Sequence, residues 1–206
     1  MYKIAVLASG SGSNLQSILD NIDNGNINGE VSLVIGSKEG IFALERAEKH
    51  GIKTSVVSKK EFGDKTSDEI LRLAKENNID LIVLAGYLSI LEGKLLEEYG
   101  NRIINIHPSL IPSFCGNKMY GINVHKAAIE KGVKFSGCTV HFVNDEVDGG
   151  AIIAQEIVEV NFEDTPESLQ KKVLEKEHIL LPRIVKCLCE EKIEIHNGKV
   201  KILRIC

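Results

Sequence analysis

The chain has 206 residues, of which 43% are hydrophobic and 26% are charged, and its formal net charge is −4. This length fits one large domain, and the composition is that of a soluble globular protein. No apolar run is long enough to span a bilayer, so we do not expect a membrane partner. The net charge is negative, whereas proteins that bind nucleic acid usually carry a basic patch, so we do not expect nucleic acid either. The N-terminus enters a strand directly and lacks a signal-peptide pattern, which predicts a cytoplasmic protein.

The first element is a predicted strand over Tyr2 to Ala8, where the apolar run is continuous. A glycine- and serine-rich turn, Ser9 to Asn14, separates it from a helical pattern that begins at Leu15. Glycine lets the backbone approach a ligand, and the free amides of a first helical turn point at an anion. The turn is neither a Walker loop nor a full dinucleotide fingerprint. A purely structural turn with a Ser or Asn cap therefore stays open as the alternative.

Strand and helix patterns then alternate as far as His107. Repeated strand-then-helix order predicts a parallel sheet covered by helices on both faces. The predicted strands cover Glu30 to Gly36, Lys53 to Val57, Ile79 to Leu84 and Arg102 to His107, and the predicted helices cover Phe42 to His50, Asp64 to Asn77 and Leu91 to Tyr99.

The pattern changes after His107. A long loop over 108–123 is expected to be functional, because loops of this length are uncommon inside a compact domain. Within it, Phe114 and Tyr120 could cover a site, although surface packing is the simpler interpretation. The elements expected next are a helix over Val124 to Lys131, strands over Cys138 to Val143 and Ala151 to Val160, a long helix over Thr165 to Glu190 with a kink or break at Pro182, and a hairpin over Ile193 to Ile205 that turns at Asn197-Gly198.

Two short stretches carry the candidate chemistry. Asn105 and His107 stand where Pro108 must end a strand, and ligands bind at that edge of an open α/β sheet. Asp148 lies in an acidic turn that ends in two glycines. An amide, an imidazole and a carboxylate suit acyl transfer to an amine, because a carboxylate orients an imidazole and favours its charged form. Each stretch alone could instead be a satisfied strand end or an ordinary acidic turn.

Taken together, six motifs resemble the phosphoribosylglycinamide formyltransferase family. They run in the order of that family from near residue 1 to about residue 182 of this chain. They are Ser9 to Gln16, Leu84 to Tyr87, Asn105 to Pro112, His141 to Val143, Asp145 to Gly150 and Glu177-His178.

The resemblance implies an α/β, Rossmann-like formyltransferase fold with a largely parallel sheet, extended by a long helix and a C-terminal antiparallel hairpin. It implies one domain over 1–206, with a nucleotide-phosphate half over 1–107, a folate and catalytic half over 108–190, and the hairpin over 191–206. The implied reaction transfers a formyl group from 10-formyltetrahydrofolate to the amine of glycinamide ribonucleotide in purine biosynthesis. The implied partners are these two small molecules, without a metal, and the protein would be a monomer or a homodimer.

Site residues carried over by position fall into four groups. Asn105, His107 and Asp148 would be catalytic, with Asn105 holding the formyl oxygen, and His141 would support them. The ribonucleotide would bind at Gly12, Ser13, Asn14 and Glu177. The folate would bind at Lys65, Leu88, Ser89, Ile90, Leu91, Asn105, Asp145 and Val147. Ser89 and Lys65 stand where that family often has arginine, and the loop over 113–123 is longer than usual, so its role is open.

Two alternatives remain at this point. A sister folate enzyme, either a 10-formyltetrahydrofolate hydrolase or a methionyl-tRNA formyltransferase, would share the Asn, His and Asp chemistry. We expect the hydrolase to carry an extra N-terminal domain and the tRNA enzyme a basic C-terminal domain, and neither pattern is visible. A non-catalytic nucleotide-binding module would need the anion-binding turn but not Asn105, His107 and Asp148 together.

Overall fold

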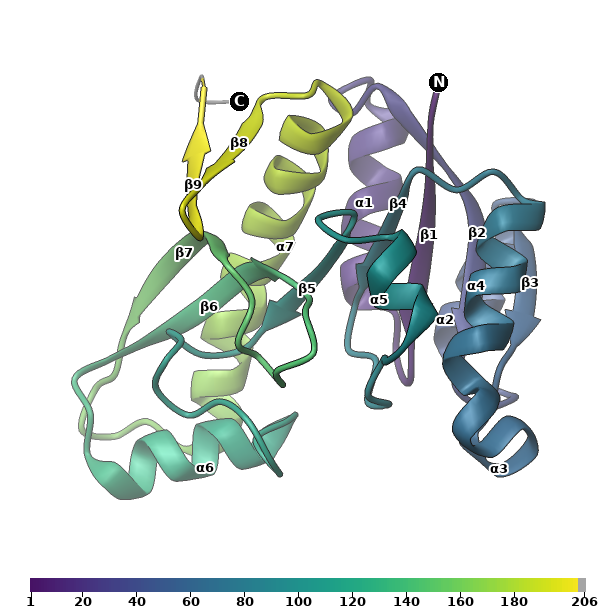
Figure 1. Ribbon diagram of the computed structural model, residues 1–206. Coiled ribbons are helices and arrows are strands. Elements are labelled where there is room, and N and C mark those ends of the chain that lie inside the picture. The colour runs from purple at the N-terminus through teal and green to yellow at the C-terminus, as the bar shows by residue number, and fades with distance from the viewer. Residues whose placement is uncertain (204–206) are drawn as a thin grey trace.

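The computed structural model describes residues 1–203 as an α/β fold built on a seven-stranded sheet in the order β3-β2-β1-β4-β5-β6-β7 (Figure 1). The strands from β3 to β5 pair in parallel, and β6 and β7 add to this sheet in antiparallel fashion. The strands are β1 (Tyr2–Ala8), β2 (Gly29–Gly36), β3 (Lys53–Val56), β4 (Leu81–Leu84), β5 (Ile103–His107), β6 (Phe135–Phe142) and β7 (Ile152–Glu159).

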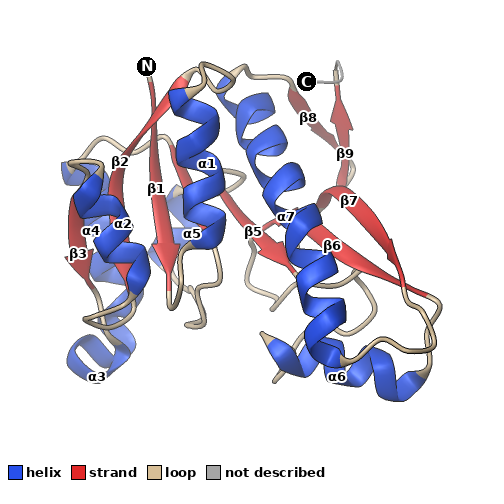
Figure 2. Ribbon diagram, turned by 180° about the vertical axis from the view of Figure 1, so that it is seen from behind, coloured by secondary structure: helices blue, strands red, loops and turns tan. Residues whose placement is uncertain are grey.

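Helices cover both faces of the sheet, as the alternating pattern predicts. One face packs against α1 (Ser13–Asp23), α2 (Phe42–Lys49) and α7 (Pro166–Cys189), which lie side by side in Figure 2. The other face packs against α4 (Thr66–Glu76) and α5 (Lys94–Glu98). Within β1 the alternate residues divide between the two cores: Ile4 and Val6 belong to the first, and Ala5 and Leu7 to the second. This period of two is why the central strands read as continuous apolar runs.

Some helix boundaries differ from the prediction. The helix expected over Asp64 to Asn77 is preceded by two short turns, α3 (Lys59–Phe62) and η1 (Gly63–Lys65). The helix expected from Leu91 begins only after Gly93, whose φ of 65° is not helical. Of the kink or break predicted at Pro182, the break is wrong, because α7 continues through this residue, and the kink stays a prediction. The start of α7 has the expected Thr165 cap, whose hydroxyl accepts from the Ser168 amide.

The second half of the chain adds α6 (Ile122–Lys131) and a two-stranded hairpin, β8 (Ile193–His196) and β9 (Lys199–Ile202). Asn197 and Gly198 turn the hairpin with φ of 50° and 74°, as a tight turn with two positive φ values requires. The expected hairpin is therefore confirmed over 193–202, and 204–206 lie outside the described residues. Within residues 1–203 no helix is both long and apolar enough to cross a membrane.

Two neighbouring residues of α7 test how much the packing of this helix contributes to stability. Leu180 is 0% exposed in the first core, and Ile179 is 59% exposed. We expect Leu180→Ala to lower the free energy of unfolding by about 2–5 kcal/mol, because it leaves a cavity. Ile179→Ala is the matched control and should change it by about 0.5 kcal/mol or less. Urea denaturation measures both, and equal losses would contradict the assigned orientation of α7.

Candidate active site

A cavity of about 810 Å³ opens at the carboxyl ends of the central strands. Its walls come from the segments that follow β1, β4 and β5, from the β6–β7 loop and from one side of α7. The lining segments are Ser9 to Asn14, Leu84 to Leu91, Asn105 to Pro108, Gly116 to Gly121 and Val143 to Asp148, with His125, His141 and residues of α7 between Glu167 and Glu177. The site thus lies at the sheet edge where open α/β folds bind their ligands.

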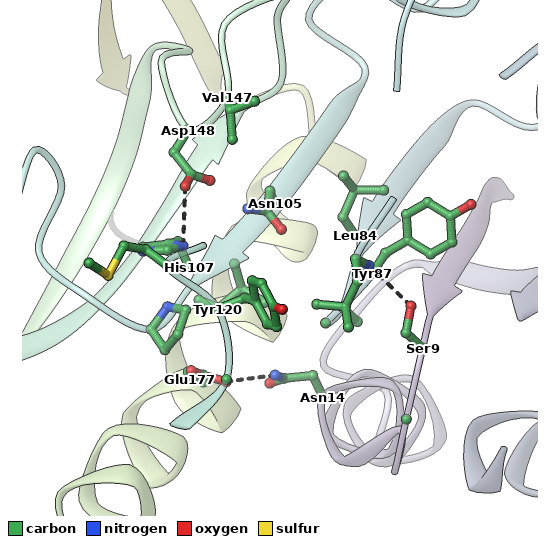
Figure 3. Close-up of a pocket in the computed structure, with 18 of the residues that line it drawn as sticks. Ser9, Asn14, Leu84, Tyr87, Asn105, His107, Tyr120, Val147, Asp148 and Glu177 are labelled. Atoms are coloured by element: carbon green, nitrogen blue, oxygen red, sulfur yellow. Dashed lines mark hydrogen bonds and ion pairs between the residues drawn. The ribbon is translucent and has the colours of Figure 1, made fainter. Parts of the chain in front are cut away.

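The Asp148 carboxylate lies between two imidazoles, and Figure 3 shows its contact with one of them, His107. Its Oδ2 is 3.6 Å from His107 Nδ1, and its Oδ1 is 3.7 Å from His141 Nε2. The sheet register explains this cluster, because Asn105 on β5 is the cross-strand partner of His141 on β6. Directly opposite side chains touch, and Asn105 Nδ2 is 3.1 Å from His141 Nε2. His107 follows two residues later on the same face of β5.

Backbone carbonyls determine which imidazole nitrogens carry protons. His107 Nε2 is 2.9 Å from Phe114 O, and His141 Nδ1 is 2.8 Å from Phe142 O. A carbonyl oxygen only accepts, so both nitrogens are N–H donors. In the tautomer with the proton on Nδ1, His141 Nε2 accepts from the Asn105 amide. This bond uses one amide N–H of Asn105 and leaves the second for a ligand.

The protonation of His107 differs from the expectation. Burial lowers the pKa of His107 and outweighs the opposing effects of Asp148 and the Phe114 carbonyl. The imidazole is therefore predominantly neutral near neutral pH, whereas we expected Asp148 to keep it partly charged. Burial raises the pKa of the Asp148 carboxyl, but His141, the Gly116 amide and His107 outweigh it and hold that pKa below its usual value. The pair is a neutral base beside a carboxylate.

Backbone geometry holds Asp148 in place. Its φ is 56°, in the left-handed region that non-glycine residues rarely adopt. Gly116 N donates to Asp148 Oδ2 at 2.8 Å. Gly150 lies so close to β6 that a Cβ atom there would come within 1.8 Å of Phe142 O. A glycine is therefore required at this position for the turn to pack against β6.

The turn after β1 has the geometry of an anion-binding loop. Gly12 caps α1 with φ of 70° and no side-chain capping bond, so the alternative of a Ser or Asn cap is wrong. A Cβ atom on Gly12 would lie 2.7 Å from Ala43 Cα, which keeps the turn tight against α2. The first amides of a helix have no intrahelical partner, and here the residues that carry them line the cavity.

A buried hydrogen bond joins this loop to α7. Asn14 Nδ2 donates to Glu177 Oε2 at 2.7 Å, and both side chains are buried (Figure 3). Burial raises the pKa of Glu177 to about 7, against the opposing effect of Asn14. The cavity therefore contains a carboxyl group that exchanges its proton near neutral pH.

The structure places all but one of the site residues predicted from the sequence around this cavity. Leu88, Ile90 and Val147 expose apolar side chains at its rim, and Ser89, Leu91 and Asp145 line it with them. Lys65 does not line it. It is exposed in η1, the short 3-10 turn that precedes α4.

Sequence reasoning missed several lining residues. His125, at the start of α6, is buried beside the site, and burial followed by the charge of His107 lowers its pKa to about 4. Gln170 and Leu174 lie seven and three residues before Glu177 on α7, a helical spacing that could have identified them. Lys118 belongs to the long loop, where no periodicity could place it, and Tyr120, which the sequence offered as a possible cover of the site, also lines the cavity.

The raised pKa of Glu177 predicts a pH-dependent contribution to stability. The folded protein holds this proton more tightly than an ordinary glutamate with a pKa of 4.5, so the contribution is complete below pH 4.5 and is lost as the pH rises through about 7. In the wild type, we expect the free energy of unfolding to fall by up to about 3 kcal/mol as the pH rises through this range, and we expect Glu177→Gln to abolish this fall. Urea denaturation at about pH 5 and pH 8 measures it, with the exposed Glu175→Gln as control. The same pH dependence in wild type and Glu177→Gln would contradict the assignment.

Comparisons with known proteins agree with this geometry. A family model described as formyl transferase matches residues 2–185. A chloroplastic phosphoribosylglycinamide formyltransferase from Arabidopsis thaliana is 40% identical over 98% of this chain and 70% of its own length. The Haemophilus influenzae phosphoribosylglycinamide formyltransferase is 39% identical over 96% of this chain and 92% of its own length. The crystal structure of glycinamide ribonucleotide transformylase 1 from Symbiobacterium toebii has a TM-score of 0.93 at 38% identity and covers 99% of this chain and 95% of that one.

Relatives of other lengths match as well. The chain spans 20% of the trifunctional purine biosynthetic protein adenosine-3 from Gallus gallus, at 40% identity. A formyltetrahydrofolate deformylase from Pseudomonas syringae has a TM-score of 0.90 at 28% identity, and this chain covers 66% of it. The identity over nearly the whole chain is higher to the ribonucleotide enzymes than to the deformylase. The chain therefore belongs to the formyl transferase family, within its phosphoribosylglycinamide formyltransferases.

Proposed function

We propose that this protein transfers a formyl group from 10-formyltetrahydrofolate to the amine of glycinamide ribonucleotide, a step of purine biosynthesis. The observation that carries the proposal is the Asp148 carboxylate between His107 and His141, in a cavity that also contains an anion-binding loop. Acyl transfer to an amine needs a proton acceptor and a donor for the carbonyl oxygen, and this cluster supplies both.

The ribonucleotide fits the side of the cavity formed by α1 and α7. Its phosphate would accept from the amides at Gly12, Ser13 and Asn14, where the helix dipole favours an anion. Glu177 would bond to the ribose hydroxyls, since a carboxyl group can accept from them when ionised and also donate when protonated. This places the amine of the substrate toward His107 and Asp148.

The folate fits the opposite side. Leu88, Ile90 and Val147 offer apolar surface to a flat ring, and Ser89, Leu91, Asn105 and Asp145 line the wall beside them. Lys65 does not line the cavity, so its proposed contact with folate would involve a part of the ligand that extends out of the cavity.

In the proposed reaction the amine attacks the formyl carbon and the carbonyl oxygen becomes negatively charged. The second N–H of Asn105 Nδ2 would donate to this oxygen, because the first is directed to His141. Such a donor acts most strongly where charge develops, in a site that excludes water. His141 thus serves as a positioning residue that fixes the Asn105 amide.

The pair of Asp148 and His107 would receive the proton of the attacking amine. Both nitrogens of His107 face oxygen acceptors, and a neutral ring can donate to only one of them. Once protonated, the ring can donate to both Phe114 O and Asp148, and its positive charge stabilises the nearby oxyanion. The bond from the formyl carbon to N10 of the folate then breaks, and the proton passes to N10.

Three further properties remain predictions. The division into a nucleotide-phosphate half over 1–107, a folate and catalytic half over 108–190 and a hairpin over 191–206 stays a prediction, because each side of the cavity takes residues from both of the larger parts. We also propose a cytoplasmic location and a monomeric or homodimeric state, with the two small molecules as partners and no metal. Fractionation and sedimentation measurements test the location and the assembly.

The function is tested by following tetrahydrofolate formation by absorbance, with glycinamide ribonucleotide as the acceptor. We expect turnover that depends on the ribonucleotide and yields its formylated amine. Water as the acceptor defines the alternative, hydrolysis of the formyl group as in a deformylase. Folate release at the same rate without the ribonucleotide would overturn the transferase assignment.

Asp148 and His107 should act as one unit. We expect Asp148→Asn and His107→Asn each to lower kcat by at least about a hundredfold, because each removes part of the proton acceptor. The double variant should be little worse than the poorer single variant. Dissociation constants for both substrates should change much less.

A double-mutant cycle on kcat measures this coupling. Asp68→Asn and His196→Asn, which change exposed residues outside the cavity, are matched controls and should keep wild-type rates. Fully additive losses would show independent roles, and a near-normal kcat for Asp148→Asn would remove Asp148 from the mechanism.

A further inference from the structure

The long loop between β5 and α6 is anchored on the two catalytic side chains. His107 Nε2–H donates to Phe114 O at 2.9 Å, and Gly116 N–H donates to Asp148 Oδ2 at 2.8 Å. The loop backbone is therefore part of the wall that positions His107 and Asp148. We call the following segment, Asn117 to Gly121, the loop tip.

The long loop has an unusual backbone from Phe114 to the end of the loop tip. Phe114, Gly116, Lys118 and Gly121 have φ of 50°, 85°, 65° and 55°. Lys118 and Phe114 are not glycine, and side-chain-bearing residues rarely adopt this region. Such outliers persist where the surrounding structure determines them, and they gather at ligand sites. Here they direct the tip toward the cavity instead of into solvent.

The two aromatic residues of the loop have different environments. Phe114 packs against the first core, so the packing interpretation is correct for it. Tyr120 is 52% exposed and lines the cavity. Figure 3 shows its ring in the cavity, between His107 and the Asn14–Glu177 pair. An exposed ring at this position has no core to pack on, and a ligand surface is the partner that the geometry offers.

Charge gives the loop tip a second feature. Among residues 1–203, Lys118 and Lys171 are the only lysine or arginine side chains that line the cavity, and neither is paired with another described residue. Arg46, the cation beside the anion-binding loop, already donates to Ser11 O and Gln16 Oε1. The remaining charged side chains of the wall are acidic: Asp145, Glu146, Asp148, Glu167 and Glu177.

We propose that the loop tip is a wall of the ribonucleotide site, in which the Lys118 ammonium pairs with the phosphate and the Tyr120 ring packs against the sugar. The inference rests on the proposed function. A phosphate carries close to two negative charges at neutral pH, and amides alone do not balance them among several carboxylates. The loop leads into α6, which packs on α7, the helix that carries Glu177, and the apolar rim proposed for the folate is opposite.

The test compares glycinamide ribonucleotide with its dephosphorylated ribonucleoside as acceptors. Lys118→Met should raise the KM for the ribonucleotide about tenfold or more, the effect of one charge-assisted hydrogen bond, and leave the ribonucleoside unchanged. Tyr120→Ala should raise the KM for both acceptors. Tyr120→Phe should keep both KM values at the wild-type level, since packing on the sugar needs only the ring. The KM for folate should stay at the wild-type value in all variants.

Lys131→Met and Phe135→Ala, which change exposed residues outside the cavity, are the matched controls. An equal rise in KM for both acceptors in Lys118→Met would overturn the phosphate contact. So would a rise in KM that is specific to the ribonucleotide and is seen in Lys171→Met but not in Lys118→Met. A change in the folate KM in place of the ribonucleotide KM would overturn the assignment of the wall.

Failure of the inference is distinguishable from failure of the proposed function. A wild-type protein that formylates the ribonucleotide, with unaltered kinetics in the loop-tip variants, overturns the inference alone. A wild-type protein without turnover overturns the function. Calorimetric titration of the ribonucleotide into wild type and Lys118→Met then still decides the inference, because equal affinities, or no binding to either, would overturn it.

Discussion

The site depends on the confinement of one carboxylate, that of Asp148, between two imidazoles. A buried carboxylate is costly unless its oxygens are satisfied, and here a backbone amide and two rings surround it. The sheet supplies one ring through the β5–β6 register and the other through the end of β5. The left-handed turn at Asp148 and the close packing of Gly150 then bring the carboxylate back over them. A shift of register by one residue would turn these side chains to the other face.

Different environments set the protonation of the three acidic and basic groups. His107 is kept neutral by burial, and Asp148 is kept ionised by its partners. Glu177 is buried with one hydrogen bond, and its pKa is raised to about 7. Pairs of groups whose environments push their pKa values in different directions are the means by which one cavity performs acid and base chemistry near neutral pH. The cavity therefore has a ready proton acceptor beside a carboxyl group that can bind sugar hydroxyls in either form.

Hydrogen bonds join parts of the cavity wall that are far apart in the sequence. Asn14 on α1 bonds to Glu177 on α7, although 163 residues separate them in the sequence. The long loop bonds to both His107 and Asp148. The wall of the cavity and the catalytic pair are therefore positioned by contacts that form only when the whole chain folds.

Local chemistry in the sequence determined much of this protein. Apolar runs and helical periods predicted the order of strands and helices, because burial on one or two faces imposes those periods. Pro108, the glycines of the anion-binding turn and the Asn197-Gly198 turn marked positions where backbone conformation is restricted, and the structure agrees at each. Asn105 and His107 were marked as candidates by side-chain type at a strand end, and Asp148 by its acidic turn with two glycines, while the resemblance to the family gave their catalytic roles.

Only the tertiary structure decided the rest, because it depends on distances between segments far apart in the chain. Burial made His107 neutral against the expectation from its neighbour Asp148, since desolvation depends on the whole surrounding wall. Lys65 lay outside the cavity, and Tyr120 lay inside it, because no local period positions a loop residue. The α7 helix continued through Pro182, where the local rule predicted a break, because packing against the sheet outweighs the loss of one backbone hydrogen bond.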